Sequence, residues 1–225
     1  MKTIKVMLLF MAALLFVTAA QARKKDDPKM RLVRLTMTDG KQVEGYIPAK
    51  YLMYTLQYQV KVADNPDGKK SKKYKAEDIE KMEWLTPTEE HPEGEVWEHC
   101  QTVYKHMISP SKDDCLLELL YRGKNASVYM ARIYIGGLAV NENAWATWYA
   151  LKPHGQEQAF LVYNASLGNF ACMDYQFKDN ESFAGLKDFL QAWWDKDKSL
   201  AEKQLSDSPS IFSKLYDEWR ATSGK

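Results

Sequence analysis

The sequence predicts an α+β protein in which a small five-stranded β-barrel is followed by an α+β domain. Short alternating apolar and polar runs with tight turns occupy residues 30–85. An acidic segment with two prolines follows at 86–95 and predicts a linker. Apolar residues recur at helical spacing near the end of the chain, which predicts amphipathic helices in a domain spanning 96–225.

The first 22 residues have the pattern of a secretory signal peptide. Two lysines precede a mostly apolar run at 6–17, and small residues stand at the −3 and −1 positions of a cleavage site between Ala22 and Arg23. The apolar run is too short for a membrane span. We therefore expect an exported protein, periplasmic or secreted, with no transmembrane span in the mature chain.

Composition and charge narrow the class of protein. Hydrophobic residues make up 45% of the chain, which is enough for a globular core. The formal net charge of the whole chain is +1, and the signal segment holds two of the lysines, so the mature chain is close to neutral. A neutral balance gives no general attraction to nucleic acid.

A charged lead-in at 23–29 comes before the predicted barrel. Val33 and Leu35 alternate with polar residues, and the turn at Asp39-Gly40 leads to a second strand. Gly45 stands in that strand where a strong bend leaves no room for a side chain.

The same alternation of apolar and polar residues predicts the rest of the barrel. A third strand is expected at 56–62, a fourth at 70–75 and a last one around Met82 and Trp84. A single helical turn is expected at 76–79.

The run VRLTMTDGKQVEGYI, residues 33–47, resembles the first hairpin of SH3-like and Sm-like barrels. The resemblance implies a small barrel with a bent second strand. It implies no function, because such barrels serve many unrelated roles. The RNA-binding residues of Sm-like proteins are not recognisable here, and export argues against RNA, so we expect no nucleic-acid partner.

In the second domain, apolar spacing over 96–108 predicts an amphipathic helix. The apolar run at 116–121 predicts a further buried element, ended by Gly123 as a helix C′ residue. An antiparallel sheet and two C-terminal helices are expected to complete the domain. The strands are expected at 127–135, 144–151, 158–163 and 170–177, and the helices at 183–194 and from Ser208-Pro209 to Trp219.

The layout as a whole resembles uncharacterised exported proteins of Gram-negative bacteria. The resemblance is carried by the β-rich front, the segment Ser127-Val-Tyr129 and the C-terminal helices at 183–219. It implies a location in the bacterial envelope and no catalytic residue.

The three cysteines, Cys100, Cys115 and Cys172, allow three pairings in an oxidising compartment. A Cys100–Cys115 disulfide closes the shortest loop and is our candidate bridge. Three buried free thiols are the alternative.

Two groups of side chains are candidates for binding. The lysine run is a candidate for anionic lipid or glycan, and its structural alternative is a solvated hairpin that protects a sheet edge. Trp145 and Trp148 are candidates for stacking on sugars, and their structural alternative is core packing. The lysines of the run are Lys69, Lys70, Lys72, Lys73 and Lys75.

Catalytic and metal sites are not indicated. His99 and His106 lie two helical turns apart in the predicted helix, about 10 Å, which is too far for one zinc ion. No serine stands in a G-x-S-x-G motif. We expect no cofactor, no metal site and no catalytic residue.

These observations predict an exported, non-enzymatic interaction module whose partner is an envelope or extracellular protein or a glycan. Two alternatives remain open. One is an envelope hydrolase with a site in the cleft between the two domains, and the other is a binder of glycan or anionic polymer.

Overall fold

The computed structural model describes residues 29–49, 51, 53–88, 92–106, 109–134, 145–170, 172–178 and 180–224. Eleven strands of the described chain form one sheet, accompanied by α-helices and short 3₁₀ turns. The strands are β1 Met30–Met37, β2 Gln42–Pro48, β3 Gln59–Ala63, β4 Ser71–Lys75, β5 Ile79–Trp84, β6 Val96–His106, β7 Ser109–Arg122, β8 Ala126–Tyr134, β9 Trp145–Pro153, β10 Gln158–Asn164 and β11 Asn169–Phe170. The helices are α2 Met53–Tyr58, α3 Leu186–Lys196, α4 Lys198–Asp207 and α5 Ile211–Ser223, with 3₁₀ turns η1 Ala76–Asp78, η2 Asp174–Phe177 and η3 Glu181–Phe183.

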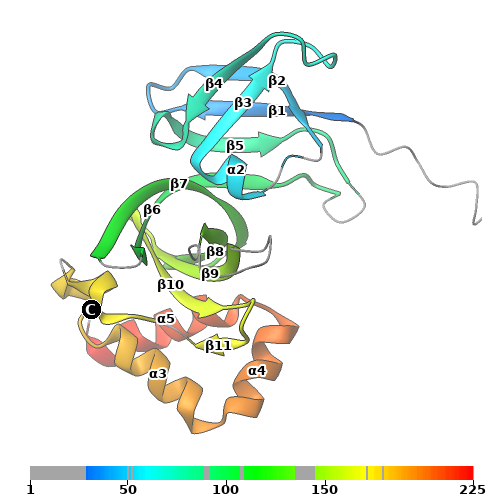
Figure 1. Ribbon diagram of the computed structural model, residues 1–225. Coiled ribbons are helices and arrows are strands. Elements are labelled where there is room, and N and C mark those ends of the chain that lie inside the picture. Colours follow the sequence, from blue (N-terminus) through cyan, green and yellow to red (C-terminus); the bar gives the residue numbers. More distant parts are fainter. Residues whose placement is uncertain are drawn as a thin grey trace, which may run out of the picture.

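The molecule has three tiers (Figure 1). The front strands, β1–β5, pair in the order β5-β1-β2-β3-β4. Strands β6–β10 form the middle tier, and α3, α4 and α5 cover its far side. The predicted α+β class is confirmed, with a small five-stranded barrel and C-terminal helices.

The front strands follow the alternation that the sequence predicts. Val33 and Leu35 are fully buried, and Gly40 adopts a φ of +81° in the turn between β1 and β2. A Cβ atom on Gly45 would lie 2.4 Å from Val62 Cγ1 and 2.6 Å from the Ala63 carbonyl oxygen, so β2 and β3 approach too closely for a side chain. The predicted helical turn at 76–79 is confirmed as η1.

The predicted strand over 56–62 is partly wrong, because helix α2 occupies its first half. Leu56 packs into the core of the front strands, and Tyr58 packs against the middle tier. The Arg132 backbone N–H donates to Gln57 Oε1, so α2 joins the two tiers. This tertiary position overrides the strand propensity of the segment.

Strands β6–β10 form a closed barrel. Each strand pairs antiparallel with the next, and β10 also pairs parallel with β6 through Gln158–Gln101 and Ala159–Thr102. The Gln101 N–H donates to the Glu157 carbonyl oxygen at 2.9 Å at this seam. We call β6–β10 the closed barrel.

The side-chain amide of Gln176 continues the seam where the parallel pairing stops. The Leu161 N–H donates to Gln176 Oε1 at 2.6 Å, and Gln176 Nε2 donates to the Leu161 carbonyl at 2.9 Å. Gln158 Nε2 donates to the Gln176 carbonyl at 2.7 Å. One buried amide thus satisfies the backbone of β10 as a neighbouring strand would.

The helix predicted over 96–108 is wrong, and so is the helical ending assigned to 116–121, since both segments are strands. Both faces of these strands are buried. Trp97 and Leu116 pack into the front core, whereas Cys100 and Leu117 pack inside the closed barrel. Strands buried on both sides show no apolar–polar alternation, and their apolar spacing then imitates a helix.

The end of the chain differs from prediction in two places. The strand expected at 170–177 is reduced to β11, and η2 follows it. The C-terminal helices are confirmed as α3 and α5, but α4 lies between them and was not predicted. The Asp197 side chain accepts from the Leu200 N–H at 3.0 Å and caps α4.

The predicted acidic linker connects two strands that pair with each other. Met82 lies opposite Trp97 in the antiparallel pair of β5 and β6. Arg31 forms an ion pair with Glu95 at 3.0 Å, and its guanidinium lies 4.0 Å from the centre of the Trp84 ring. The front strands and the closed barrel therefore share one continuous sheet.

Three hydrophobic cores follow from the alternation of side chains across the strands. One fills the front strands and another fills the closed barrel. The third lies between the barrel and the helices, where Phe160 and Val162 of β10 meet Leu186, Leu190 and Phe212. No helix within the described residues has the length and apolar character needed to cross a membrane.

Cys100 and Cys115 lie directly opposite each other on β6 and β7. Opposed residues of antiparallel strands have Cα atoms about 4.5–5.5 Å apart, a separation that a disulfide can span. All three cysteines are nevertheless buried free thiols in the structure, so the predicted bridge is not formed in it. Cys115 Sγ instead lies 3.4 Å from the Cys100 carbonyl oxygen, to which it donates.

Burial predicts the reactivity of these thiols. It raises the pKa of both Cys100 and Cys172 to about 12, and that of Cys115 in the same direction. We expect the native protein to resist iodoacetamide at pH 8, and the denatured, unreduced protein to take up three alkyl groups, counted by intact mass. A count of one after denaturation would contradict the thiol form and reveal a bridge.

Candidate functional site

The interior of the closed barrel changes from apolar to polar toward one end. Ala131 of β8 and Ala150 of β9 lie in the barrel core. Side chains two residues apart on a strand lie on the same face, so Tyr129 of β8 and Lys152 of β9 point the same way as these two alanines. Glu98 stands in the same relation to Cys100 on β6. Strand alternation therefore gathers charged and hydroxyl groups at the barrel mouth.

Tyr129 links the barrel core to these charges. Its hydroxyl donates to Glu98 Oε2 at 2.6 Å, although the residue is only 2% exposed. The other carboxylate oxygen of Glu98 forms an ion pair with Arg122 at the surface. Burial is the main factor that raises the pKa of Tyr129, and proximity to Cys100 and the bond to Glu98 raise it further. The phenol therefore stays protonated and acts as a donor.

Ser127 and His154 lie beside this arrangement. Ser127 Oγ forms a hydrogen bond with His154 Nε2 at 3.1 Å. Ser127 also opposes the rise in the pKa of Tyr129, which places its hydroxyl near the phenol. Glu98, Tyr129, Ser127 and His154 therefore form one group of polar side chains at the barrel mouth.

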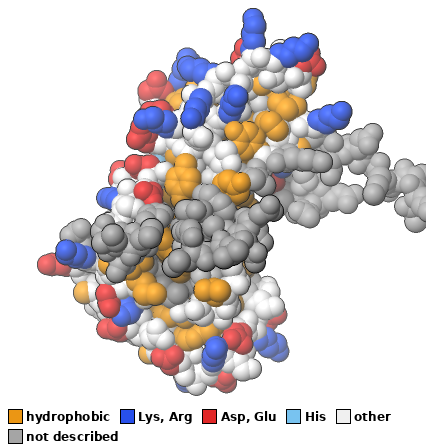
Figure 2. Space-filling view, viewed as in Figure 1, with side chains coloured by type: hydrophobic (Ala, Val, Ile, Leu, Met, Phe, Trp, Pro, Cys, Tyr) orange, Lys and Arg blue, Asp and Glu red, His pale blue; other side chains and the backbone are white. Residues whose placement is uncertain are grey.

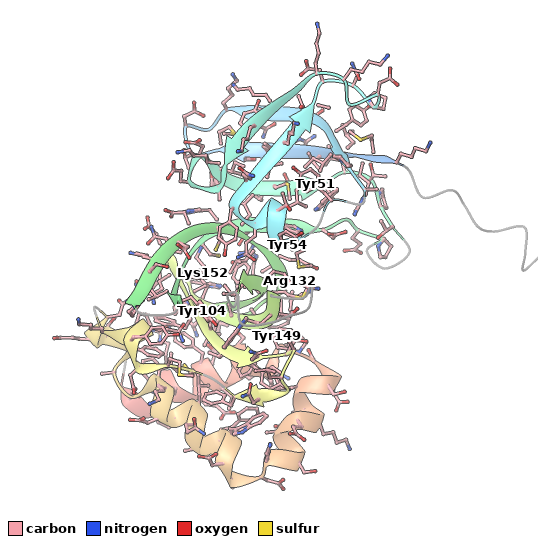
Figure 3. All side chains as sticks on the ribbon, in the orientation of Figure 1. Tyr51, Tyr54, Tyr104, Arg132, Tyr149 and Lys152 are labelled. Atoms are coloured by element: carbon pink, nitrogen blue, oxygen red, sulfur yellow. The ribbon has the colours of Figure 1, made fainter. Side chains whose placement is uncertain are left out.

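Lys152 of β9 lines the barrel mouth together with Glu98 and Tyr129. It is labelled on the closed barrel in Figure 3. Its Nζ donates to the His99 carbonyl oxygen at 2.6 Å and lies 6.0 Å from the centre of the Tyr129 ring. It also lowers the pKa of Cys100, but burial outweighs this effect. Cys100 is therefore a protonated, buried thiol and not an activated nucleophile.

Two hollows open at this end of the molecule. The mouth hollow has a volume of about 320 Å³ and the helix hollow about 450 Å³. They share Pro153, His154 and Gln156, so we treat them together as the paired hollow. The mouth hollow is also lined by Glu98, Arg122, Ser127, Tyr129, Lys152 and Gly155, and the helix hollow by Asn125, Ser182, Phe183, Tyr216, Trp219 and Arg220.

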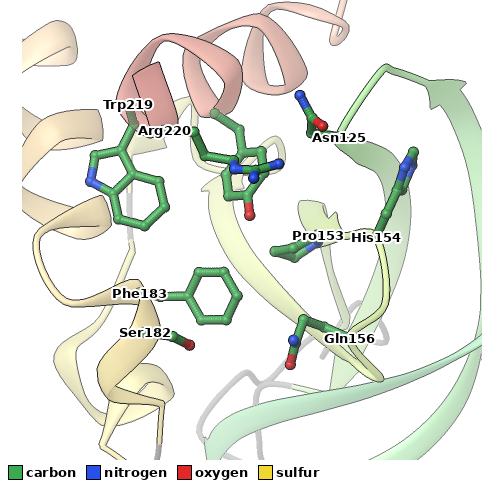
Figure 4. A pocket seen from close by; sticks show the side chains of 9 residues that line it. Asn125, Pro153, His154, Gln156, Ser182, Phe183, Trp219 and Arg220 are labelled. Atoms are coloured by element: carbon green, nitrogen blue, oxygen red, sulfur yellow. The ribbon is translucent and has the colours of Figure 1, made fainter. Parts of the chain in front are cut away.

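Three parts of the chain build the helix hollow (Figure 4). Trp219 and Arg220 come from α5, Ser182 and Phe183 from η3, and the strand side supplies the other residues labelled there. The rings of Phe183 and Trp219 stack at 6.2 Å with 28° between their planes. Asn125 Nδ2 donates to Asp217 Oδ1 at 2.8 Å, which ties the strand side to α5.

Gly123 explains how closely α5 approaches the barrel. A Cβ atom there would lie 1.8 Å from Ser213 Oγ and 2.6 Å from the Ala126 carbonyl oxygen. Ser213 Oγ donates to that carbonyl at 2.8 Å. Gly123 was predicted to end a helix, but it leaves room for the contact that positions one wall of the helix hollow.

The structure does not bring the sequence-predicted site residues together. Trp148 is 5% exposed and packs edge-on against Tyr104, so it offers no surface for sugars. Cys100 lies in the core of the closed barrel, with Cys115 opposite it. The side chain of Trp145, and both Ala22 and Arg23 of the cleavage site, lie outside the described residues.

The lysine run lies far from the paired hollow, on and just before β4, at an edge of the sheet. All five lysines are exposed, and Figure 2 shows Lys and Arg side chains spread over the front strands. Lys75 pairs with Glu77 at 2.8 Å, and Lys72 Nζ lies 5.0 Å from the centre of the Tyr74 ring. These positions favour protection of the sheet edge.

Sequence reasoning missed most of the paired hollow. Ser127 and Tyr129 were noted only as part of a strand, while Glu98 and His154 were assigned no role in binding. These residues lie on the same strand faces as core residues, as Glu98 does with Cys100 and Tyr129 with Ala131. The sequence could have shown this only if β6, β8 and β9 had been predicted with the correct faces turned inward. Comparisons with protein-family models, curated proteins and solved structures found no match to this chain.

Replacing Tyr129 with Phe tests the hydrogen bond from Tyr129 to Glu98. We expect Tyr129→Phe to lower the free energy of unfolding by about 1–3 kcal/mol at pH 7, because Glu98 loses a buried donor. Since the pKa of Tyr129 is raised from 10.0, the stability it contributes is complete below pH 10 and is lost above it. The difference between the two proteins in urea unfolding should therefore shrink above pH 10.

Tyr121→Phe is the matched control, because Tyr121 is 40% exposed on β7. We expect it to change the stability by about 0.5 kcal/mol or less. Equal effects of the two substitutions would contradict the role given to Tyr129.

Proposed function

We propose that this chain is an exported, non-enzymatic binding module that holds a small ligand in the paired hollow. The observation that carries the proposal is the lining itself. Arg122, Lys152 and Arg220 stand against one carboxylate, Glu98, beside oriented amide and hydroxyl groups. The volume of each hollow, about 450 Å³ and about 320 Å³, falls in the range of small-molecule sites.

The burial of Ser127 favours binding over catalysis. A serine nucleophile gives its proton to a histidine base and must be reached by the substrate. Here Ser127 lies 3.1 Å from His154 Nε2, but it is only 1% exposed. The hydrogen bonds of Ser127 and Tyr129 instead hold the mouth of the barrel in one arrangement, which suits recognition.

A hydrolase is the second candidate, and the Ser127–His154 contact is the observation that favours it. Donation of the Ser127 proton to His154 when a substrate binds would make His154 a base. Its site would be the paired hollow on the barrel and helices, not a cleft between the front strands and the barrel.

We also propose that the chain is exported and that its front strands form an SH3-like barrel. The signal-peptide pattern of residues 1–22 and the resemblance to exported bacterial proteins support an envelope location. The order β5-β1-β2-β3-β4 and the close approach at Gly45 support an SH3-like arrangement of the front strands. The exposed lysines of β4 offer a separate surface for an anionic polymer, as a lesser alternative.

One experiment tests location and binding together. The full-length gene is expressed in a Gram-negative host with ¹⁵N labelling, and the exported protein is purified and its N-terminus read. Soluble envelope glycan fragments are then added and followed by NMR and mass spectrometry. We expect a chain that begins at Arg23, saturable shifts around Asn125, His154 and Trp219, and fragments of unchanged mass.

Other outcomes would overturn the proposal in distinct ways. Retention of the full chain in the cytoplasm would contradict export. Shifts confined to Lys69–Lys75 would move the site to β4. Cleavage of the fragments by the wild type but not by Ser127→Ala would establish the hydrolase, with Ser111→Ala, a serine outside the hollow, as the control for a structural effect.

A further inference from the structure

We propose that the free edge of β4 binds an acidic, extended peptide segment of another protein, which adds to the sheet as a further strand. This edge lies far from the paired hollow, so the inference goes beyond the proposed function and does not rest on it. Three properties of β4 support it, namely its unpaired backbone groups, its positive charge and the presence of lysines on both of its faces.

The backbone of β4 carries hydrogen-bonding groups that no described strand uses. Of the described strands, only β3 pairs with β4. The Asp64 N–H donates to the Lys70 carbonyl oxygen at 3.2 Å, and alternation along the ladder makes Lys72 the next residue bonded to β3. Ser71 and Lys73 therefore direct their N–H and C=O groups away from β3, toward the free edge. An added strand can pair with these groups.

The lysines of the β3–β4 hairpin are available to a partner. Residues 59–75 hold six lysines against two aspartates. Lys75 pairs with Glu77, whereas the exposed ammonium groups of Lys69, Lys70 and Lys73 have no ion-pair partner among the described residues. The hairpin thus presents uncompensated positive charge that complements the carboxylates of an acidic segment.

Two of these lysines face each other across the hairpin. Lys61 of β3 lies directly opposite Lys73 of β4, and both are exposed. Like charges in directly opposed positions destabilise a strand pair. A carboxylate on the other side of Lys73, at the opposed position of an added strand, would offset this repulsion.

The lysines of β4 lie on both faces of the strand. Lys73 and Lys75 lie on one face and Lys72 lies on the other, where its Nζ is 5.0 Å from the centre of the Tyr74 ring. A planar anionic surface such as a membrane contacts one face of a sheet. The side chains of an added strand alternate between both faces, as those of β4 do, so this distribution favours an extended peptide.

Protection of the edge by lysine is compatible with such a partner. Lysines on an edge strand repel strands that carry positive charge, and a second copy of this chain carries the same six lysines. An acidic segment replaces this repulsion by attraction. The edge is therefore closed to copies of itself and open to an acidic strand, which is the selectivity that a binding edge needs.

The test compares blocked peptides of about eight residues, the length of an ordinary strand. One alternates glutamate with threonine, a second alternates lysine with threonine, and a third is the first peptide with its backbone nitrogens methylated. The third peptide keeps the carboxylates but has no backbone donors. An oligogalacturonate with the same number of carboxylates represents an anionic glycan.

Binding to the purified ¹⁵N-labelled protein is followed by NMR. We expect saturable binding of the glutamate–threonine peptide and none of the lysine–threonine peptide. The methylated peptide and the oligogalacturonate should bind at least about tenfold more weakly, the scale of two backbone hydrogen bonds. The glutamate–threonine peptide alone should slow hydrogen exchange of the Ser71 and Lys73 amides, because it alone pairs with them.

Lys73→Gln and Lys203→Gln form a matched pair, since each removes one exposed lysine and Lys203 lies on α4. We expect Lys73→Gln to weaken binding of the glutamate–threonine peptide about two- to fivefold, the scale of one cross-strand charge pair. Lys203→Gln should leave this binding unchanged.

Ser71→Pro separates pairing from charge, because it removes one N–H from the free edge and keeps all six lysines. Ser71 is the first residue of β4, a place where a strand tolerates proline. We expect this variant to weaken binding of the glutamate–threonine peptide about threefold or more and to leave oligogalacturonate binding unchanged. If the variant fails to fold, the exchange of the Ser71 and Lys73 amides in the wild type decides the same point.

Three results would overturn the inference. Absence of saturable binding of the glutamate–threonine peptide would exclude an acidic strand. Equal binding of the methylated peptide, with no slowing of exchange at Ser71 and Lys73, would show attraction of charge without strand pairing. Tighter binding of the oligogalacturonate would assign the lysines to anionic glycan. None of these results concerns the paired hollow, so they are distinguishable from failure of the proposed function.

Discussion

The structure depends on the parallel seam between β6 and β10. Without it, β6–β10 would be an open meander with two edges, and the alternation of side chains would expose one apolar face. The seam is short, with two registered residue pairs and the Gln101 N–H bond to Glu157. Gln176 extends it by satisfying both backbone groups of Leu161.

Closure of the barrel by this seam also determines where the polar side chains lie. It encloses Cys100, Cys115 and their neighbours in a buried core and leaves Glu98, Tyr129 and Lys152 at the mouth. The opposite faces of β8, β9 and β10 remain apolar, and the helices α3–α5 cover them. The helix hollow forms where α5 meets the strand ends, because Gly123 permits the close contact with Ser213.

Local patterns predicted the front strands well and the middle of the chain poorly. Val33 and Leu35 alternate with polar neighbours because one face of β1 is less buried than the other. Trp97 and Cys100 face two different cores, so their strand carries apolar residues on both sides and imitates a helix. The side chains of the candidate site were missed for the same reason, since Glu98 and Tyr129 meet only after the barrel closes.

Hydrogen exchange at the seam tests the central claim, that β6 and β10 close the barrel. Closed pairing predicts that the backbone amides of Gln101 and Leu161 exchange only through global unfolding, as slowly as the core amide of Ala150. Rapid exchange of Gln101 and Leu161 beside a protected Ala150 would show that the seam is open, and would contradict the account of the site built on it.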